Sequence, residues 1–293
     1  MNDARKGPAR ENSPAVVITG ASTGIGAACA LALDSLNYSV FAGVRSEADG
    51  RRLQQQASPR LVPVMIEVTD EGSVRAAADS VRTAVGAAGL AGLVNNAGIV
   101  VSGPLELLPL DEVRKQFDVN VIGTVAVIQA FVPLLRQARG RIVNIGSVNG
   151  RLAAPYLGPY SASKFALEAV TDSLRLELRS WGIRVSIVEP ASVQTPIWKK
   201  SIAAADALTK EASAQELELY EADLDAMRRL TDQLAQSAMP AERVARKVVH
   251  ALTARRPKTR YPVGIEARWA MRAVRWLPDR LRDRIVRRSI GLP

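Results

Sequence analysis

The chain has 293 residues, of which 47% are hydrophobic, so it can bury a full core as one large domain and is not disordered over most of its length. Its single histidine, His250, gives little support to a serine–histidine hydrolase or to a metal site built from several histidines, and we expect no metal. The single cysteine, Cys29, can form no internal disulfide. Its Ala- and Leu-rich surroundings indicate core packing, and a reducing cytoplasm fits this usage.

The net charge of +10 is concentrated at the C-terminal end of the chain. Residues 240–293 contain 15 Lys or Arg and 4 Asp or Glu, whereas residues 1–239 contain 24 and 25. Residues 1–13 are polar and lack the apolar run of a signal peptide, so we interpret them as a disordered tail. No stretch reaches the roughly 20 uninterrupted apolar residues of a spanning helix. These features predict a cytoplasmic protein, either soluble or bound to a membrane peripherally.

The folded part begins with a strand, a glycine-rich turn and a helix. Residues 15–19 are apolar and β-branched, residues 20–26 are rich in glycine, and residues 25–36 have helical periodicity. In such a unit the glycines let the backbone approach a pyrophosphate, and the helix N-terminus offers unpaired amide donors. The strict G-x-G-x-x-G pattern is absent, however. The residues alone therefore leave a cofactor loop and an ordinary tight connection as equal alternatives.

Strands and helices then alternate. We predict further strands at 39–43, 61–67, 92–95, 141–146 and 183–188 and helices at 48–56, 71–85, 110–137 and 157–181. Repeated units of this length predict an α/β fold, a Rossmann-type doubly wound parallel sheet with helices on both faces, as a single domain over residues 14–265. Beyond Pro190 the pattern is helical, at 199–238 and 241–253, with an extended piece at 259–263. We expect residues 190–240 to cover the substrate site.

Tyr160 and Lys164 are four residues apart and share one face of a predicted helix. An ammonium within about 4–6 Å of a phenol lowers the phenol pKa by about 1–3, which makes a tyrosine useful as an acid or base near neutral pH. The same spacing is common on solvated helix faces, so the pair alone is weak evidence.

Several separated motifs together resemble the short-chain dehydrogenase/reductase family over residues 14–200. Residues 19–26 (TGASTGIG) are similar to that family's cofactor loop and residues 95–98 (NNAG) to a motif that follows one of its strands. The family's catalytic tetrad is matched in residue type and spacing by Asn120, Ser147, Tyr160 and Lys164. Two further stretches, 147–153 and 184–190, resemble the branch that contains retinol and hydroxysteroid dehydrogenases.

The resemblance implies a role for each member of this tetrad. Tyr160 is the general acid that protonates a carbonyl oxygen as hydride arrives, or the base in the reverse direction. Lys164 lowers the Tyr160 pKa and holds the nicotinamide ribose. Ser147 hydrogen-bonds the substrate oxygen, with a loop-capping serine as the alternative. Asn120 anchors a water in a proton relay to Lys164, with a solvated mid-helix asparagine as the alternative.

The resemblance also implies the cofactor-binding positions, which are Gly20, Ser22, Thr23, Gly24, Ile25, Gly26, Arg45, Val68, Asn96, Ala97, Gly98, Tyr160, Lys164, Pro190 and Thr195. An NAD site of this type carries Asp or Glu about 20 residues beyond the glycine motif. Here Val44 occupies that place and Arg45 follows it. With a guanidinium available for a 2′-phosphate and no carboxylate to repel it, NADP(H) is favoured over NAD(H). A solvated Arg45 is the alternative.

Two positions depart from the family's pattern. Glu67 stands where the family often has Asp near the adenine, so we expect Val68 rather than Glu67 to contact the adenine. Ala191 follows Pro190 where the family often has glycine, which reduces the backbone freedom of that loop. The resemblance still implies that Thr195 meets the nicotinamide carboxamide, with a residue in an ordinary turn as the alternative.

The candidate substrate-facing residues are apolar, with ordinary core packing as the alternative for each, and they are Val148, Leu152, Leu157, Ile197 and Trp198. Such a site prefers a lipophilic alcohol or carbonyl compound, for example a steroid, retinoid or aliphatic ketone. The leading hypothesis is therefore an NADP(H)-dependent oxidoreductase for such substrates. The alternative is a catalytically idle nucleotide-sensing or scaffold protein on the same fold.

Partners are predicted from two helical regions. The helices at 110–137 and 157–181 resemble those through which the family forms dimers or tetramers. In the tail, residues 266–293, the side chains of Trp269, Ala273 and Trp276 share one helical face beside arginines, and Leu281 and Ile285 align in a second helix. Such basic amphipathic helices can lie on an anionic membrane or pack on the protein itself. The basic charge alone is weak support for nucleic-acid binding, and we expect none.

Overall fold

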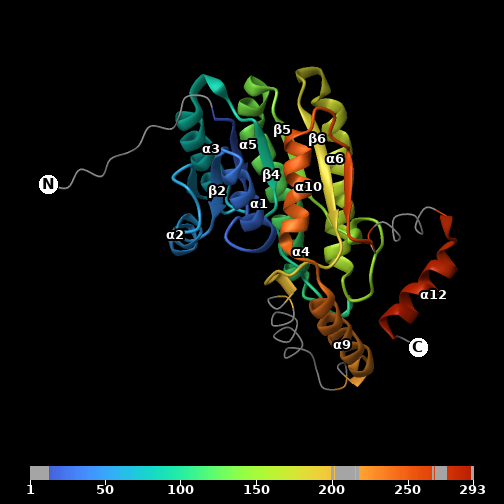
Figure 1. Cartoon of the computed structure of the whole chain (residues 1–293). Coiled ribbons are helices and arrows are strands. Elements are labelled where there is room, and N and C mark those ends of the chain that lie inside the picture. The colour runs from blue at the N-terminus through green and yellow to red at the C-terminus, as the bar shows by residue number, and fades with distance from the viewer. Residues whose placement is uncertain are drawn as a thin grey trace.

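The computed structural model describes residues 13–198, 201, 215, 218–265, 267 and 276–291. Within them, seven parallel strands form one sheet in the order β3-β2-β1-β4-β5-β6-β7 (Figure 1). The strands are β1 (Ala15–Ile18), β2 (Ser39–Val44), β3 (Leu61–Met65), β4 (Gly92–Asn95), β5 (Arg141–Ile145), β6 (Arg184–Pro190) and β7 (Arg260–Val263). The strand order reverses between β1 and β4, so the predicted doubly wound α/β fold is confirmed. Such a reversal opens a crevice at the carboxyl ends of these strands.

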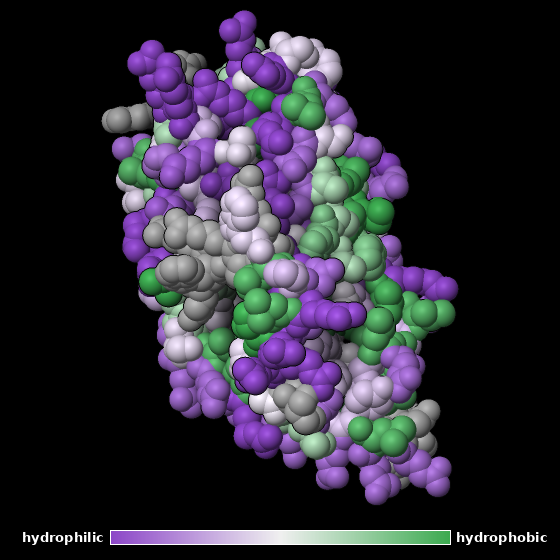
Figure 2. Space-filling view, turned by 90° about the vertical axis from the view of Figure 1, so that its right-hand side faces the viewer, coloured by the Kyte–Doolittle hydropathy of each residue, from purple (hydrophilic) through white to green (hydrophobic). Residues whose placement is uncertain are grey.

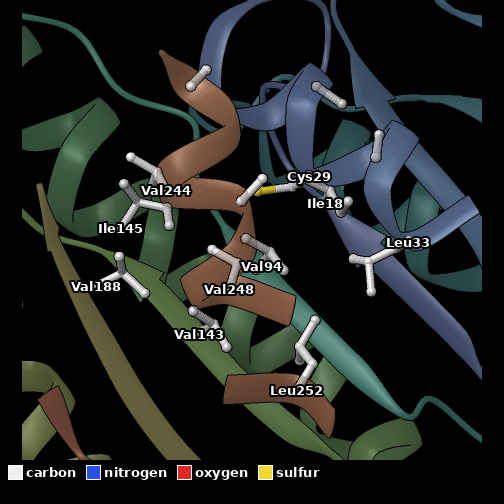
Figure 3. Close-up of a cluster of buried hydrophobic side chains, with 14 of the residues drawn as sticks. Ile18, Cys29, Leu33, Val94, Val143, Ile145, Val188, Val244, Val248 and Leu252 are labelled. Atoms are coloured by element: carbon white, nitrogen blue, oxygen red, sulfur yellow. The ribbon is translucent and has the colours of Figure 1, made fainter. Parts of the chain in front are cut away.

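Two helical layers cover the sheet. One face carries α1 (Gly24–Ser35), α2 (Glu47–Gln54) and α10 (Ala241–Thr253), and the other carries α3 (Glu71–Val85), α5 (Gly123–Ala138) and α6 (Gly158–Glu177). Side chains from the first layer and from β1, β4, β5 and β6 interlock in the core shown in Figure 3. Cys29 lies in this core, where burial raises the pKa of its thiol to about 12, so the residue packs rather than reacts.

The predicted helix at 110–137 differs from the structure. It is divided into α4 (Leu110–Phe117) and α5 by a π-helical turn at Asp118–Ile122. Asn120 lies inside this turn, and its side chain bonds both backbone polar groups of Ile99. The widened turn therefore accompanies a tertiary contact that helical periodicity does not reveal.

The stretch Leu110–Ala138 has the length and hydropathy of a membrane-spanning helix, although 50% of its most apolar window is buried inside the protein. No long uninterrupted run of apolar residues marks this stretch in the sequence, because its hydropathy is a mean over a window that also contains polar residues.

The region beyond Pro190 is helical, as predicted. It contains α9 (Glu221–Ser237), α10 and α12 (Asp279–Ile290), and α12 contacts α9 at the edge of the molecule (Figure 1). Most of the remaining predicted helix at 199–238, together with Trp269 and Ala273, lies outside the described residues.

Candidate active site

A cavity of about 390 Å³ lies at the carboxyl ends of the central strands, where the strand order reverses. The predicted cofactor positions that line it are Gly20, Ser22, Thr23, Gly24, Ile25, Arg45, Val68, Asn96, Ala97, Gly98, Tyr160, Lys164, Pro190 and Thr195. These residues come from the ends of five strands and from α1 and α6. The fold therefore brings almost the whole predicted set to one cavity.

The turn after β1 is shaped for a close backbone approach. Gly20 and Gly24 have φ values of +62° and +58°, which side chains rarely tolerate. A Cβ atom on Gly24 would lie 2.8 Å from Cγ2 of Thr195, so only glycine leaves the space between these two walls open. Gly26 differs from its prediction, because it does not line the cavity. A Cβ there would meet the Gly20 oxygen at 2.3 Å, so Gly26 packs α1 against the turn.

The first turn of α1 suits an anionic group. Among the described residues no side chain caps this helix, and its first turn carries no acidic residue. The backbone N–H groups of this turn have no partners within the helix, and they lie at the helix N-terminus, which carries a partial positive charge. This donor set, with the glycine walls beside it, fits the pyrophosphate of a dinucleotide.

The NNAG motif is held to the glycine-rich turn by Thr19, a residue absent from the predicted set. Its Oγ1 accepts hydrogen bonds of 3.0 Å from the backbone N–H groups of Asn96 and Ala97. Asn96 Nδ2 in turn donates to the carbonyl oxygens of Thr19 and Gly20. The motif therefore locks two neighbouring loops together while its backbone lines the cavity.

Arg45 stands at the rim of the cavity, with 69% of its side chain exposed. Its Nη1 is 3.8 Å from Oε2 of Glu67, and Glu67 lines the cavity beside Val68. The structure thus puts Glu67 in the wall as well as Val68, which differs from our preference for Val68 alone. The negative charge of Glu67 beside Arg45 affects whether this part of the cavity favours NADP(H) or NAD(H).

Tyr160 and Lys164 lie on the first turns of α6, and both are buried. Lys164 Nζ donates a 2.9 Å hydrogen bond to the carbonyl oxygen of Ile145 and is 5.8 Å from the centre of the Tyr160 ring. Ser147 lies two residues beyond the end of β5 and caps the following 3-10 turn, accepting from Asn149 N–H at 3.1 Å. It therefore combines the capping role with a place in the cavity wall.

The electrostatics of this pair differ from the expectation. Burial raises the pKa of Tyr160 above its usual 10, and interaction with the Ser147 hydroxyl only partly offsets this rise. Burial lowers the pKa of Lys164 to about 8, against an opposing effect of the Glu168 carboxylate. Lys164 is not among the groups that alter the Tyr160 pKa, and its ammonium donates to the Ile145 carbonyl oxygen.

Asn120 does not line the cavity but supports it from behind. Its Oδ1 accepts from Ile99 N–H at 2.9 Å, and its Nδ2 donates to the Ile99 oxygen and to Ser163 Oγ. Ser163 Oγ donates to the Tyr160 carbonyl oxygen at 2.7 Å. Gln116, fully buried and missed from the sequence, accepts from Val101 N–H at 2.7 Å. The sequence pattern gives no signal for it, because a glutamine is expected on the exposed face of an amphipathic helix.

The predicted substrate-facing residues divide into three groups. Ile197 and Trp198 line the cavity, and the Trp198 ring meets Tyr160 edge to face at 6.5 Å. Leu157 packs with Tyr160 in a small buried cluster next to the cavity. Val148 and Leu152 do not line it, since Val148 lies in the turn that Ser147 caps and Leu152 follows that turn. The apolar wall also includes residues that the sequence analysis missed, namely Val100, Val101, Val119 and Val193.

Comparison with known proteins gives a consistent picture. A family model described as short chain dehydrogenase matches residues 14–206. Retinol dehydrogenase 5 of Mus musculus is 38% identical over 94% of this chain and 90% of that protein. The 17-beta-hydroxysteroid dehydrogenase type 6 of Bos taurus is 39% identical over 95% of this chain and 89% of that protein.

A bacterial relative and a solved structure extend the match. The NADPH-dependent 3-dehydrocapnine reductase of Ornithobacterium rhinotracheale is 34% identical over 92% of this chain and 94% of that protein. A short chain dehydrogenase/reductase from Burkholderia phymatum, solved in complex with NAD, superposes with a TM-score of 0.76 and 28% identity over 89% of this chain and 92% of that chain.

Proposed function

The chain belongs to the short-chain dehydrogenase family and is an NAD(P)-dependent oxidoreductase acting on CH–OH groups, and on this basis we propose that it interconverts a lipophilic alcohol and its carbonyl compound with NADP(H) as the preferred cofactor. The observation that carries the proposal is one cavity lined by the glycine-rich turn, Ser147, Tyr160 and Lys164 together. Its apolar wall and its retinol- and hydroxysteroid-dehydrogenase relatives support the lipophilic substrate.

The proposed chemistry assigns one task to each side chain. The bound nicotinamide supplies or accepts the hydride. Tyr160, whose pKa burial keeps above 10, carries a proton on Oη at neutral pH and can donate it to a carbonyl oxygen. Ser147 would hydrogen-bond the same oxygen and stabilise charge that develops there. Lys164, with two ammonium hydrogens beyond the one given to Ile145, would hold ribose hydroxyls.

Arg45 and Val44 support the NADP(H) preference. Val44 lies in the wall where an NAD site of this type carries a carboxylate, and Arg45 can pair with a 2′-phosphate. One relative is NADPH-dependent by name. The carboxylate of Glu67 beside Arg45 opposes the binding of a 2′-phosphate, so the proposed preference for NADP(H) is the net effect of these two charges.

The deciding experiment is an absorbance assay of NADPH and NADH oxidation with a panel of retinoids, steroids and aliphatic ketones. We expect turnover with at least one lipophilic carbonyl and a higher kcat/KM with NADPH. Turnover of sugars or small hydroxy acids instead would contradict the substrate class, and a preference for NADH would contradict the interpretation of Arg45.

We also propose that the chain forms a homodimer or homotetramer. Large apolar side chains are exposed along the π-turn, α6 and the turn after it, and they are Ile122, Phe165, Leu176 and Trp181. Covering them with a second copy would remove their apolar surface from water. Light scattering across micromolar concentrations tests this, and a monomer throughout would contradict it.

The tail helix supports a proposal of peripheral membrane contact. On α12 the side chains of Leu281 and Ile285 are 41% and 49% exposed, beside several arginines of the same helix. The face of the molecule on the α12 side mixes hydrophobic and hydrophilic residues (Figure 2). An apolar stripe left uncovered among cations suits an anionic bilayer.

Co-sedimentation with anionic and neutral vesicles separates this contact from self-packing. We expect the intact chain to bind anionic vesicles in a salt-dependent way and the double variant Leu281→Glu, Ile285→Glu to lose this binding. Equal partitioning of the two proteins would leave α12 as a packing element.

A further inference from the structure

A cluster of five charged side chains lies behind the catalytic helix and outside the cavity. It contains Glu168 and Asp172 of α6, Glu189 of β6, Arg151 of the segment after Gly150, and Arg260 of β7. We call these residues the carboxyl cluster. None of them belongs to the cavity wall, and the mechanism proposed above uses none of them.

The two arginines bridge the carboxylates. Glu168 Oε2 accepts hydrogen bonds of 3.0 Å from Arg151 Nη2 and from Arg260 Nη2. Glu189 Oε1 accepts from Arg151 Nε at 3.2 Å and lies 3.9 Å from Arg260 Nε. Arg260 Nη2 also donates to Asp172 at 2.7 Å. Arg175 also pairs with Asp172, so Asp172 has two guanidinium partners, whereas Glu168 and Glu189 both depend on Arg151 and Arg260.

Two carboxylate oxygens of the cluster are left without partners within the described part of the chain. Glu168 Oε1 and Glu189 Oε2 are buried and have no hydrogen-bond partner among the described residues. Glu189 is 0% exposed and Glu168 is 5% exposed, so water does not satisfy these atoms from bulk solvent. Two bare carboxylate oxygens in such a place are costly. One proton held between them would give each oxygen a partner.

Charge interactions agree with this geometry. Burial, the charge of Glu189 and a hydrogen bond to Glu189 raise the pKa of Glu168 to about 7, although Arg151 and Arg260 act to lower it. The charged groups that face Glu168 are those two arginines and Glu189, together with Lys164 on α6 itself. No charged side chain of α4 or of the π-turn is among the groups that alter the Glu168 pKa.

The cluster connects three segments that carry the active site. Glu168 is one helical turn beyond Lys164, and Glu189 directly precedes Pro190 of the cavity wall. Arg151 ends the short turn that Ser147 caps. That turn packs tightly on α6, since a Cβ on Gly150 would lie 3.0 Å from the Lys164 carbonyl oxygen.

We propose that Glu168 and Glu189 share one proton, and that this carboxyl pair keeps Ser147 after β5, Lys164 on α6 and Pro190 on β6 in their correct relative positions. The positioning half of the proposal rests on the function proposed above, whereas the shared proton does not. When the proton leaves, two buried carboxylates repel each other and the arginines must redistribute. The pair therefore makes the site sensitive to pH near neutrality.

The direction of the stability effect follows from linkage. The Glu168 pKa rises from its ordinary 4.5 to about 7 on folding, so the folded protein binds the proton more tightly than the unfolded chain. The stabilisation is fully present below about pH 4.5, falls as pH rises, and is lost above about pH 7.

The proton itself is tested in the wild type by infrared spectroscopy with ¹³C-labelled glutamate. We expect a protonated-carboxyl band that persists at pH 6, where exposed glutamates are ionised, and that disappears in Glu168→Gln and in Glu189→Gln. The matched control is Glu177→Gln, an exposed glutamate of the same helix, which should leave the band unchanged. Absence of the band in the wild type would overturn the shared proton.

The positioning role is tested with the same variants. The amide of Glu168→Gln can donate to Glu189 as the proton does but cannot titrate. We expect it to fold, to flatten the fall in Tm between pH 5 and 8, and to remove a kcat inflection near pH 7 while KM for NADPH changes less than about twofold. Glu168→Ala, which leaves Arg151 and Arg260 without this partner, should lower kcat at every pH.

The outcomes separate the two proposals. An unchanged Tm slope and kcat profile in both glutamine variants would overturn the positioning role. If no carbonyl substrate is turned over at all, the function proposed above fails, while the infrared band and the Tm slope still decide whether the proton is shared. If Glu168→Gln does not fold, Glu189→Gln and the wild-type spectrum give the same decision.

Discussion

The layers of the sheet and helix α9 are packed to different degrees. Helix α1 buries five of its 12 residues and α10 six of its 13, whereas α9 buries only Ala226 among 17. The sheet layers are held by apolar contacts, while α9 is tied to the body by polar ones, including the hydrogen bond from Tyr156 to Asp223.

We expect this difference to serve two demands on the site, because residues 190–240 are predicted to cover it. Hydride and proton transfer need atoms held in place, and those atoms lie at the ends of buried strands. Access for a substrate needs a part that opens at low cost, and few buried contacts give a low local stability. The comparison leads to four predictions, ordered by the size of the expected effect.

Removing the Tyr160 hydroxyl tests the sheet side directly. We expect Tyr160→Phe to lower kcat by about 10²–10⁴-fold, the usual contribution of a positioned acid, because it deletes the transferable proton but little volume. NADPH binding, followed by fluorescence, and the circular dichroism spectrum should change little. Tyr38→Phe, at the far end of the sheet, is the control. Activity near the wild-type level would contradict the assignment of Tyr160.

Matched truncations compare the packing of the two regions. Leu33 of α1 is fully buried in the core of Figure 3, whereas Leu224 of α9 is only partly buried. We expect Leu33→Ala to lower the free energy of unfolding by about 2–5 kcal/mol and Leu224→Ala by about 1 kcal/mol or less. Urea denaturation measures both. Equal losses would show that α9 is packed as firmly as the sheet.

Charge reversal at the cofactor end has a smaller expected effect. Arg45→Asp should weaken NADPH binding by about 10- to 100-fold, the equivalent of a charge-assisted hydrogen bond, and should affect NADH much less. Isothermal titration with both cofactors checks this. Arg51→Asp, an exposed arginine of the neighbouring helix α2, should leave both affinities unchanged. Equal weakening for NADH would show that Arg45 does not meet a 2′-phosphate.

The smallest effect is expected on the α9 side. Burial and the hydrogen bond to Asp223 raise the pKa of Tyr156, so this phenol remains a donor at working pH. Tyr156→Phe removes the bond and should change KM for the lipophilic substrate by about 3- to 10-fold, with kcat and Tm nearly constant. A large loss of Tm would show that this contact supports the fold rather than access.

Local patterns determined most of the fold. The alternation of apolar strands and amphipathic helices predicted the parallel sheet and most of its strands and helices to within a few residues. The glycine-rich turn and the Tyr160–Lys164 spacing were weak evidence when taken alone, and it was their combination with other separated motifs, as a resemblance to the short-chain dehydrogenase/reductase family, that predicted the site. The NADP(H) preference and the partners stay predictions.

The remaining features depend on residues that are distant in sequence, and only the tertiary structure decided them. Gly26 packs on Gly20 and Asn96 rather than lining the cavity, and Asn120 clamps Ile99 from a π-turn. The carboxyl cluster joins α6 to β6 and β7. Polar side chains make such contacts only once burial has removed water as their alternative partner, and burial is a property of the assembled layers. The periodicity of the sequence does not predict which glutamate will pair with which arginine.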